Sequence, residues 1–129
     1  MGVVTGRKID EDGIAESLTA CTYNGDVMNN SGIEFIKFEN EHASLDYNIT
    51  ITPAVTALQT SLHGKSTKSV TTLRVNNGNC GYAGPCKPNV WSDENGQISM
   101  TYLTVAGAAL NSSAGTHLLK CEVLYIDYK

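Results

Sequence analysis

The stretch Leu45-Asp46-Tyr47-Asn48-Ile49-Thr50-Ile51-Thr52 alternates apolar and polar residues without interruption. In an extended strand, successive side chains point to opposite faces, so this alternation predicts a strand with one buried face. The apolar members would face a core: Leu45, Tyr47, Ile49 and Ile51. The next residue, Pro53, cannot donate to a sheet ladder, so it ends the strand or confines it to a sheet edge.

Other segments have the same strand character and are separated by turn residues. The segments are 17–23, 33–38, 68–75 and 97–105. The dipeptides Asn24-Gly25, Asn77-Gly78 and Asn95-Gly96 readily adopt the positive φ angles of tight turns. We therefore expect a mainly β fold built as a meander of antiparallel strands, without an internal repeat.

The C-terminal segment allows two interpretations. Asn111-Ser112-Ser113 could cap a helix over residues 116–125, although the apolar residues there form no clean helical stripe. A buried final strand over Cys121–Ile126 fits almost as well, and we expect a mixed ending.

Length and composition indicate one folded domain spanning residues 1–129. The chain is 41% hydrophobic and 17% charged, which is enough apolar material for a core. No stretch approaches the roughly 20 apolar residues of a membrane-spanning helix, so we expect no membrane partner. The first residues lack a basic region followed by an apolar run, so either the chain carries no secretory signal or one has been removed.

The net charge of −4 is unevenly distributed. Residues 1–60 carry −6 and residues 91–129 carry −2, whereas residues 61–90 carry four cations and no acid. These cations are Lys65, Lys68, Arg74 and Lys87. Either this is a chance feature of a mixed surface, or the central segment meets a negative partner such as phosphate.

Four cysteines make disulfides possible without fixing their pairing, since four cysteines allow three pairings. Cys80 and Cys86 bracket a short loop, while Cys21 and Cys121 lie near opposite ends of the chain. A zinc site usually requires two pairs of ligands that are close in the sequence. Here Cys80 and Cys86 are the only such pair, and even they are widely spaced. The three histidines are scattered singly, so we predict no metal and no cofactor.

The sequence contains no motif for catalysis. It lacks a Gly-x-Ser-x-Gly elbow, a glycine-rich phosphate loop and a His-Glu-x-x-His pair. Asp10-Glu11-Asp12-Gly13 resembles the start of a calcium loop, but Cys21 occupies the position of the closing glutamate. A solvated acidic turn explains that segment better, and we predict that the protein is not an enzyme.

Polar residues are predicted to share one face of several strands. Lys68, Val70, Thr72 and Arg74 share a face of their strand, and Lys65 lies just before it. Two other predicted strands also have a polar face. One carries Ser99 and Thr101, and the other carries Asn48 and Thr50. If these faces coincide, the sheet can bind RNA through phosphate contacts and hydrogen bonds to unpaired bases. The alternative is an ordinary solvated face.

The order of four features resembles the coat proteins of single-stranded RNA bacteriophages, closest to the Q-beta type. The features are the strand 48–53, the basic turn and strand 65–75, the Cys80–Cys86 loop followed by Lys87-Pro88, and the strand 97–105 before the polar break at 111–113. The resemblance covers about residues 45–113 and lies in layout rather than in identities.

The resemblance implies an N-terminal hairpin, a five-stranded antiparallel sheet and C-terminal helices that interlock two subunits. It also implies self-assembly of a homodimer into a virion shell, with the Cys80–Cys86 loops meeting at symmetry axes. Lys68, Thr72, Arg74, Ser99 and Thr101 would line the RNA-facing side of the sheet.

A second hypothesis is an extracellular β-sandwich module, such as an adhesin, lectin or surface-fibre domain. Disulfides Cys21–Cys121 and Cys80–Cys86 would staple it, and the first, which joins strands near the two ends of the chain, would stabilise it by roughly 2–4 kcal/mol by restricting the unfolded state. The fold expected under the first hypothesis is an antiparallel meander sheet with an N-terminal hairpin and a short C-terminal segment that is either helix or strand. Under the second, it is a disulfide-stapled sandwich.

Overall fold

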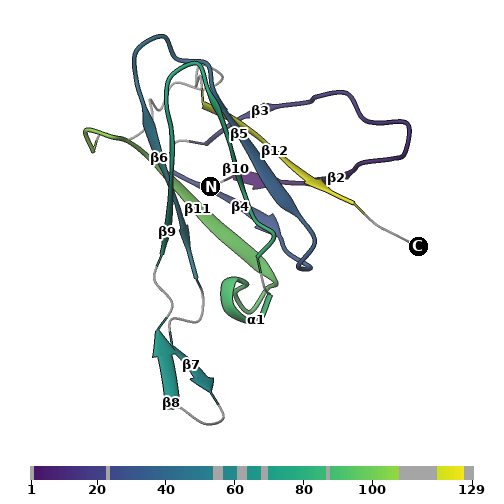
Figure 1. Cartoon of the computed structure of the whole chain (residues 1–129), viewed down its shortest axis with the longest axis vertical. Helices are drawn as coiled ribbons and strands as arrows, with labels where there is room; N and C mark the ends of the chain where they lie inside the picture. Colours follow the sequence, from purple (N-terminus) through teal and green to yellow (C-terminus); the bar gives the residue numbers. More distant parts are fainter. Residues whose placement is uncertain are drawn as a thin grey trace.

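The computed structural model describes residues 2–22, 24–53, 57–60, 64–67, 70–86, 88–107 and 119–126, with only the backbone over 57–60 and 64–67 and at residue 89. The described residues are mainly β, as predicted (Figure 1). Five strands form a first sheet in the order β1 (Gly2–Val4), β4 (Asp26–Asn29), β11 (Gln97–Thr104), β6 (Tyr47–Thr52) and β9 (Thr71–Val75).

A second sheet lies against the first. Its order is β10 (Cys80–Ala83), β5 (Phe35–Asn40), β12 (Leu119–Tyr125) and β2 (Gly6–Lys8), and β3 (Thr19–Ala20) also pairs with β12. The strands β7 (Ala57–Thr60) and β8 (Gly64–Thr67) form a separate hairpin that projects away from the two sheets (Figure 1). A one-turn helix, α1 (Pro88–Trp91), precedes β11.

The core lies between the two sheets, because alternate residues of each sheet point inward. Strand β6 contributes Tyr47, Ile49 and Ile51, as its alternation predicts, whereas Leu45 lies before the strand and is 40% exposed. The buried cluster joins side chains of both sheets, including Met28, Ile98, Met100, Ile36, Phe38 and Val123. Each fully buried isoleucine contributes roughly 1.5–3 kcal/mol through removal of apolar surface from water. The molecule is therefore a β-sandwich.

The turns follow the predicted chemistry. Gly25, Gly78 and Gly96 all have positive φ, and they lie before β4, between β9 and β10, and before β11. At Gly25 a side chain is excluded by space as well, since a Cβ atom there would lie 2.7 Å from the Met100 carbonyl oxygen. Pro53 follows the last residue of β6, as expected, although β6 is an interior strand rather than an edge.

Several expectations about strand order are wrong. The two N-terminal strands do not form a hairpin, because β1 pairs in parallel with β4 in the first sheet and β2 pairs in parallel with β12 in the second. The sheets therefore do not form a meander. The predicted strand over 17–23 is reduced to β3, and the expected loop between Cys80 and Cys86 begins as strand β10, paired with β5.

The C-terminal segment is a strand where the structure describes it. Leu119–Tyr125 forms β12, an interior strand hydrogen-bonded to β5 on one side. The helical alternative over 116–125 is therefore wrong for residues 119–125, and the subunit-interlocking helices implied by the coat-protein resemblance do not occupy them. Residues 108–118 lie outside the described part of the chain. No helix among the described residues is long and apolar enough to cross a membrane.

Candidate functional site

The polar residues singled out from the sequence share the outer face of the first sheet. Strand register places Asn48 opposite Arg74, Thr50 opposite Thr72, and Thr101 opposite Thr50. Because directly paired residues point to the same side, and because Ile49, Ile51 and Met100 occupy the core side, these polar residues all point outward. We call this surface the polar face: Asn48, Thr50, Thr72, Arg74, Ser99 and Thr101.

A row of three threonines crosses the polar face. Thr50 lies between Thr72 and Thr101 on adjacent strands, so the backbones of the three residues follow one another at the strand separation of about 4.8 Å. In the next row, Ser99 faces Thr52, an exposed residue that sequence reasoning placed on the polar side but did not select. The predicted coincidence of the polar strand faces is confirmed for six of the eight candidate residues.

The other two candidates cannot be placed on the polar face. Lys65 lies in β8, where only the backbone is described, and Lys68 lies outside the described residues. Val70, expected to share their face, precedes β9 and is 51% exposed.

Arg74, the cation of the polar face, is held in an ion pair. Its Nη2 donates to Asp46 Oδ2 at 3.0 Å, and its Nε donates to Asn76 Oδ1 at 2.9 Å. The other carboxylate oxygen of Asp46 accepts from the backbone N–H of Asn77 at 2.8 Å. The Asn77 N–H, together with Arg74, lowers the pKa of Asp46 below its usual value. Asp46 thereby ties the β9–β10 turn to the start of β6.

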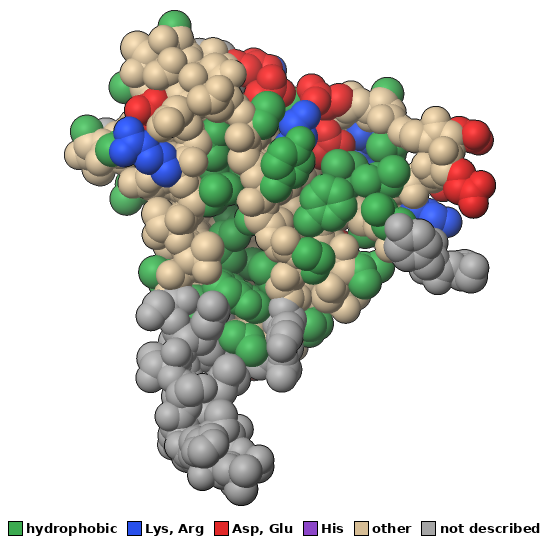
Figure 2. All heavy atoms as spheres, viewed as in Figure 1, with side chains coloured by type: hydrophobic (Ala, Val, Ile, Leu, Met, Phe, Trp, Pro, Cys, Tyr) green, Lys and Arg blue, Asp and Glu red, His purple; other side chains and the backbone are tan. Residues whose placement is uncertain are grey.

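Ion pairing extends to every lysine and arginine side chain that the structure describes. The pairs are Arg7–Glu122, Lys8–Asp10, Lys37–Glu16, Arg74–Asp46 and Lys120–Glu41. Figure 2 shows charged side chains gathered mainly over the upper and right-hand parts of the molecule, with few over the lower centre. The described part of the polar face is therefore close to electrically neutral.

A cleft borders the polar face at the open edge between the two sheets. Its volume is about 430 Å³, and Thr72 belongs both to its lining and to the polar face. The remaining wall comes from β9, from β10 with the loop after it, from the end of β6 and from α1: Ile51, Thr71, Leu73, Tyr82, Ala83, Gly84, Pro85, Cys86 and Trp91. No pattern in the sequence indicates this cleft, because it depends on how the sheet edges approach each other.

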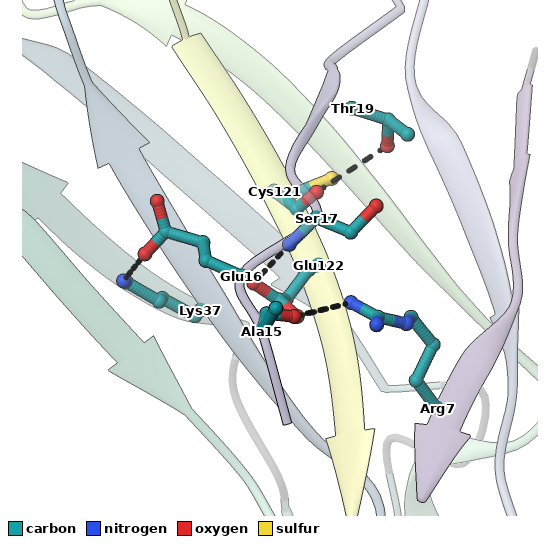
Figure 3. Close-up of polar contacts among 8 residues, drawn as sticks. All are labelled: Arg7, Ala15, Glu16, Ser17, Thr19, Lys37, Cys121 and Glu122. Carbon is teal, nitrogen blue, oxygen red and sulfur yellow. Dashed lines mark hydrogen bonds and ion pairs between the residues drawn. The ribbon is translucent and has the colours of Figure 1, made fainter. Parts of the chain in front are cut away.

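The outer face of the second sheet is covered by the acidic N-terminal segment. Figure 3 shows Glu122 of β12 between Arg7 and the backbone of Ser17. Arg7 Nη1 donates to Glu122 Oε1 at 3.2 Å and to the Ala15 carbonyl oxygen at 3.1 Å. Lys37 and Glu16 form a neighbouring ion pair. Glu122 is only 4% exposed, so this segment works as a structural cover.

All four cysteines are described, and none forms a disulfide. Cys80 is exposed on β10, and Cys86 contributes to the cleft wall. Cys21 and Cys121, separated by most of the chain, are both buried in the core. The hydrogen bond to Cys121, together with burial, raises the pKa of the Cys21 thiol. The two disulfides of the sandwich hypothesis are therefore absent from this structure. The sulfur atoms of Cys21 and Cys121 nevertheless lie within 4.8 Å of each other.

The predicted acidic turn and the described histidine have local structural roles. Asp10 accepts, through its carbonyl oxygen, the N–H of Gly13 at 2.9 Å, which closes a turn. His42 Nδ1 accepts the backbone N–H groups of Ser44 and Leu45. His63 and His117 lie outside the described residues.

Comparisons with protein-family models, with curated proteins and with solved structures find no match for this chain.

Proposed function

We propose that this chain is a non-catalytic β-sandwich binding module that holds an uncharged, hydroxyl-rich ligand, such as a glycan chain, on its polar face. The observation that carries the proposal is the row Thr72–Thr50–Thr101, flanked by Ser99 and Asn48. Hydroxyl and amide groups both donate and accept hydrogen bonds, as sugar hydroxyls do. A regular array of such groups on a rigid sheet suits a polar, neutral chain.

The charge of the polar face favours a neutral ligand over a phosphate backbone. Binding to nucleic acid phosphates draws its affinity from lysine and arginine that release counterions. On this face Arg74 already pairs with Asp46, and Asp46 is held in place by Asn77. A phosphate group would have to compete with a carboxylate that is 3.0 Å from the guanidinium.

The adjoining cleft extends the polar face with apolar and aromatic surface. It begins at Thr72 and contains Tyr82 and Trp91, and its volume of about 430 Å³ lies within the range of ligand pockets. Aromatic side chains offer a flat apolar surface together with a polar handle, which suits the mixed faces of a sugar ring. A module of this kind would work outside the cell or on a surface.

A glycan array probed with the full chain tests the proposal. We expect binding to a restricted set of neutral glycans, and loss of that binding in the double variant Thr50→Val, Thr72→Val, which removes hydroxyls at nearly constant shape. The matched control is Thr5→Val, since Thr5 is exposed and lies between β1 and β2. Equal binding by both variants, or no glycan bound by the folded wild type, would count against the proposal.

A second candidate is a virion coat protein that dimerises, self-assembles and binds single-stranded RNA on the same face. The observation that favours it is that six of the eight residues expected to contact RNA lie together. Light scattering after size-exclusion chromatography distinguishes the two candidates. Large particles with nuclease-sensitive absorbance support the coat protein, whereas a monomer or small oligomer without nucleic acid supports the binding module.

Paired substitutions test the role of Arg74 if particles containing RNA are found. Arg74→Gln should reduce the RNA content per particle, and Lys120→Gln should not, because Lys120 pairs with Glu41 on the second sheet. The two variants remove the same charge from the same kind of ion pair. Equal RNA content in both would exclude the polar face as the RNA surface.

A further inference from the structure

Two cysteines and an aspartate converge inside the sandwich from two distant parts of the chain. Cys21 follows β3, Asp26 begins β4 and Cys121 lies in β12. The two sulfur atoms and a carboxylate oxygen all lie within 4.8 Å of one another. The exposed fractions are 0% for both cysteines and 2% for Asp26. The cluster therefore joins the two sheets at a position that water does not reach.

Backbone pairing fixes the positions of both cysteines. Thr19 lies opposite Cys121 in the β3–β12 ladder, and the N–H of Cys21 donates to the Leu119 carbonyl oxygen at 2.9 Å, which continues that ladder. Cys21 and Cys121 therefore point to the same core side of the second sheet. Because they are held on adjacent segments, the two sulfurs stay close without any side-chain rearrangement.

Asp26 belongs to the first sheet, and two hydrogen bonds orient its carboxylate. Its Oδ2 accepts from the Tyr102 hydroxyl at 2.7 Å and from the backbone N–H of Thr22 at 3.0 Å. Gly2 closes the other side, since a Cβ atom there would lie 2.3 Å from Asp26 Oδ1 and 2.5 Å from Thr22 Oγ1. The carboxylate is thus fixed by partners that are not themselves cations.

We propose that Cys21, Cys121 and Asp26 form a binding site for one Zn²⁺ ion per chain. Zn²⁺ takes thiolate sulfur at about 2.3 Å and carboxylate oxygen at about 2.0–2.2 Å, and tetrahedral geometry with such bonds places two sulfurs about 3.8 Å apart. The observed cluster, with all three ligand atoms within 4.8 Å, accommodates that arrangement. Tyr102 is the fourth polar group at the site, through its hydrogen bond to Asp26.

The electrostatics of the site favour a cation. Each described lysine and arginine pairs with an acid other than Asp26, so the Asp26 carboxylate is buried without a cationic partner among the described residues. Burying a carboxylate is costly unless it is paired or coordinates a metal. A bound Zn²⁺ supplies the missing charge, and the hydrogen bonds from Tyr102 and Thr22 hold the carboxylate toward the metal, as partners of metal ligands commonly do.

Sequence spacing could not reveal this site. A zinc motif is normally recognised from close ligand pairs, whereas Cys21 and Cys121 are brought together only by the pairing of β3 with β12. The expectation of no metal site relied on that spacing. The proposal is independent of what the polar face binds.

The test uses the tag-free full chain, purified with a phosphine reductant and stripped of metal. We expect one Zn²⁺ per chain by native mass spectrometry and elemental analysis. Titration with Co²⁺ should produce thiolate-to-metal charge-transfer absorption and the ligand-field bands of tetrahedral cobalt. These cobalt spectra report thiolate ligation in the wild-type protein, so they do not depend on whether a variant folds.

Variants assign the ligands. Cys21→Ser, Cys121→Ser and Asp26→Asn should each lose stoichiometric binding, and Tyr102→Phe should weaken it about tenfold, the effect expected for a residue that orients a ligand. The matched control is Cys80→Ser, because Cys80 is exposed on β10 and should leave binding unchanged.

Two results would overturn the proposal. One is a reduced, folded wild type that binds no Zn²⁺ or Co²⁺, including the case in which the untreated protein contains a Cys21–Cys121 disulfide. The other is metal binding that survives Cys21→Ser and Cys121→Ser but is lost in Cys80→Ser.

Discussion

Phe38 and Tyr102 meet edge to face across the sandwich, with ring centroids 6.3 Å apart and ring planes 68° apart. Phe38 belongs to β5 of the second sheet and Tyr102 to β11 of the first. Burial, followed by the neighbouring Cys21, raises the pKa of Tyr102, so its hydroxyl keeps its proton and donates to Asp26. This contact links the packing of the two sheets to the position of β4.

Replacing Phe38 by alanine should lower the free energy of unfolding by about 3–5 kcal/mol, because it creates a cavity between the sheets. Phe38 is completely buried. Urea denaturation measures the loss. Phe35→Ala is the matched control, since Phe35 lies on the same strand but is only half-buried. Similar losses in the two variants would show that Phe38 does not hold the sheets together.

Replacing Glu122 by glutamine should lower the free energy of unfolding by about 1.5–3 kcal/mol, the range for hydrogen bonds to charged groups. The charge of Glu122 holds Arg7 and the backbone N–H of Ser17 over the second sheet. Amide hydrogen exchange should also become faster at Ser17. The control is Glu41→Gln, because the more exposed Lys120–Glu41 pair should contribute less than about 1 kcal/mol.

The features of the fold that could be predicted from the sequence are those determined by neighbouring residues. The alternation of residues 47–52 and the Asn-Gly turns are local signals, and they correctly placed the core side of β6 and the positive φ of Gly25, Gly78 and Gly96. The polar face followed from the same alternation, because strands that each bury one side must align their other sides. These features could be predicted before any pairing was known.

The features that the sequence missed depend on pairing between distant segments. Strands β1 and β2 are only three residues long, too short for a periodic signal, and each joins a different sheet in parallel. The burial of Glu122 depends on a covering segment more than 100 residues earlier in the chain. The proximity of Cys21 to Cys121 has the same origin.

Asn40 is a further residue whose role only the structure reveals, and its replacement by alanine should destabilise the fold. The side chain is fully buried, and its Nδ2 donates to the carbonyl oxygens of Leu45 and Val75 at 2.7 and 3.1 Å. Leaving a buried polar group unsatisfied costs about 1–3 kcal/mol, so Asn40→Ala should lower the unfolding free energy by at least about 2 kcal/mol. Urea denaturation measures the change, and Asn76→Ala, at an exposed position, should have little effect.

Asp46 should make the stability of the fold depend on pH in the acid range. Its folded-state pKa is lowered, first by the Asn77 N–H and then by Arg74, so its contribution is fully present above the unfolded-state pKa of about 4 and is lost as the pH falls through the lower folded-state pKa. The difference in urea midpoint between the wild type and Asp46→Asn should therefore be largest near neutral pH and should shrink below about pH 4.

The variant Arg74→Gln separates the two causes of that pKa shift. It removes the guanidinium but keeps the backbone N–H of Asn77, which donates to Asp46 Oδ1 at 2.8 Å. In this background, Asp46→Asn should still reduce stability more at neutral pH than at low pH, but by a smaller amount than in the wild type. If Asp46→Asn instead changed stability by the same amount from about pH 3 to pH 7 in both backgrounds, neither partner would hold the carboxylate in solution.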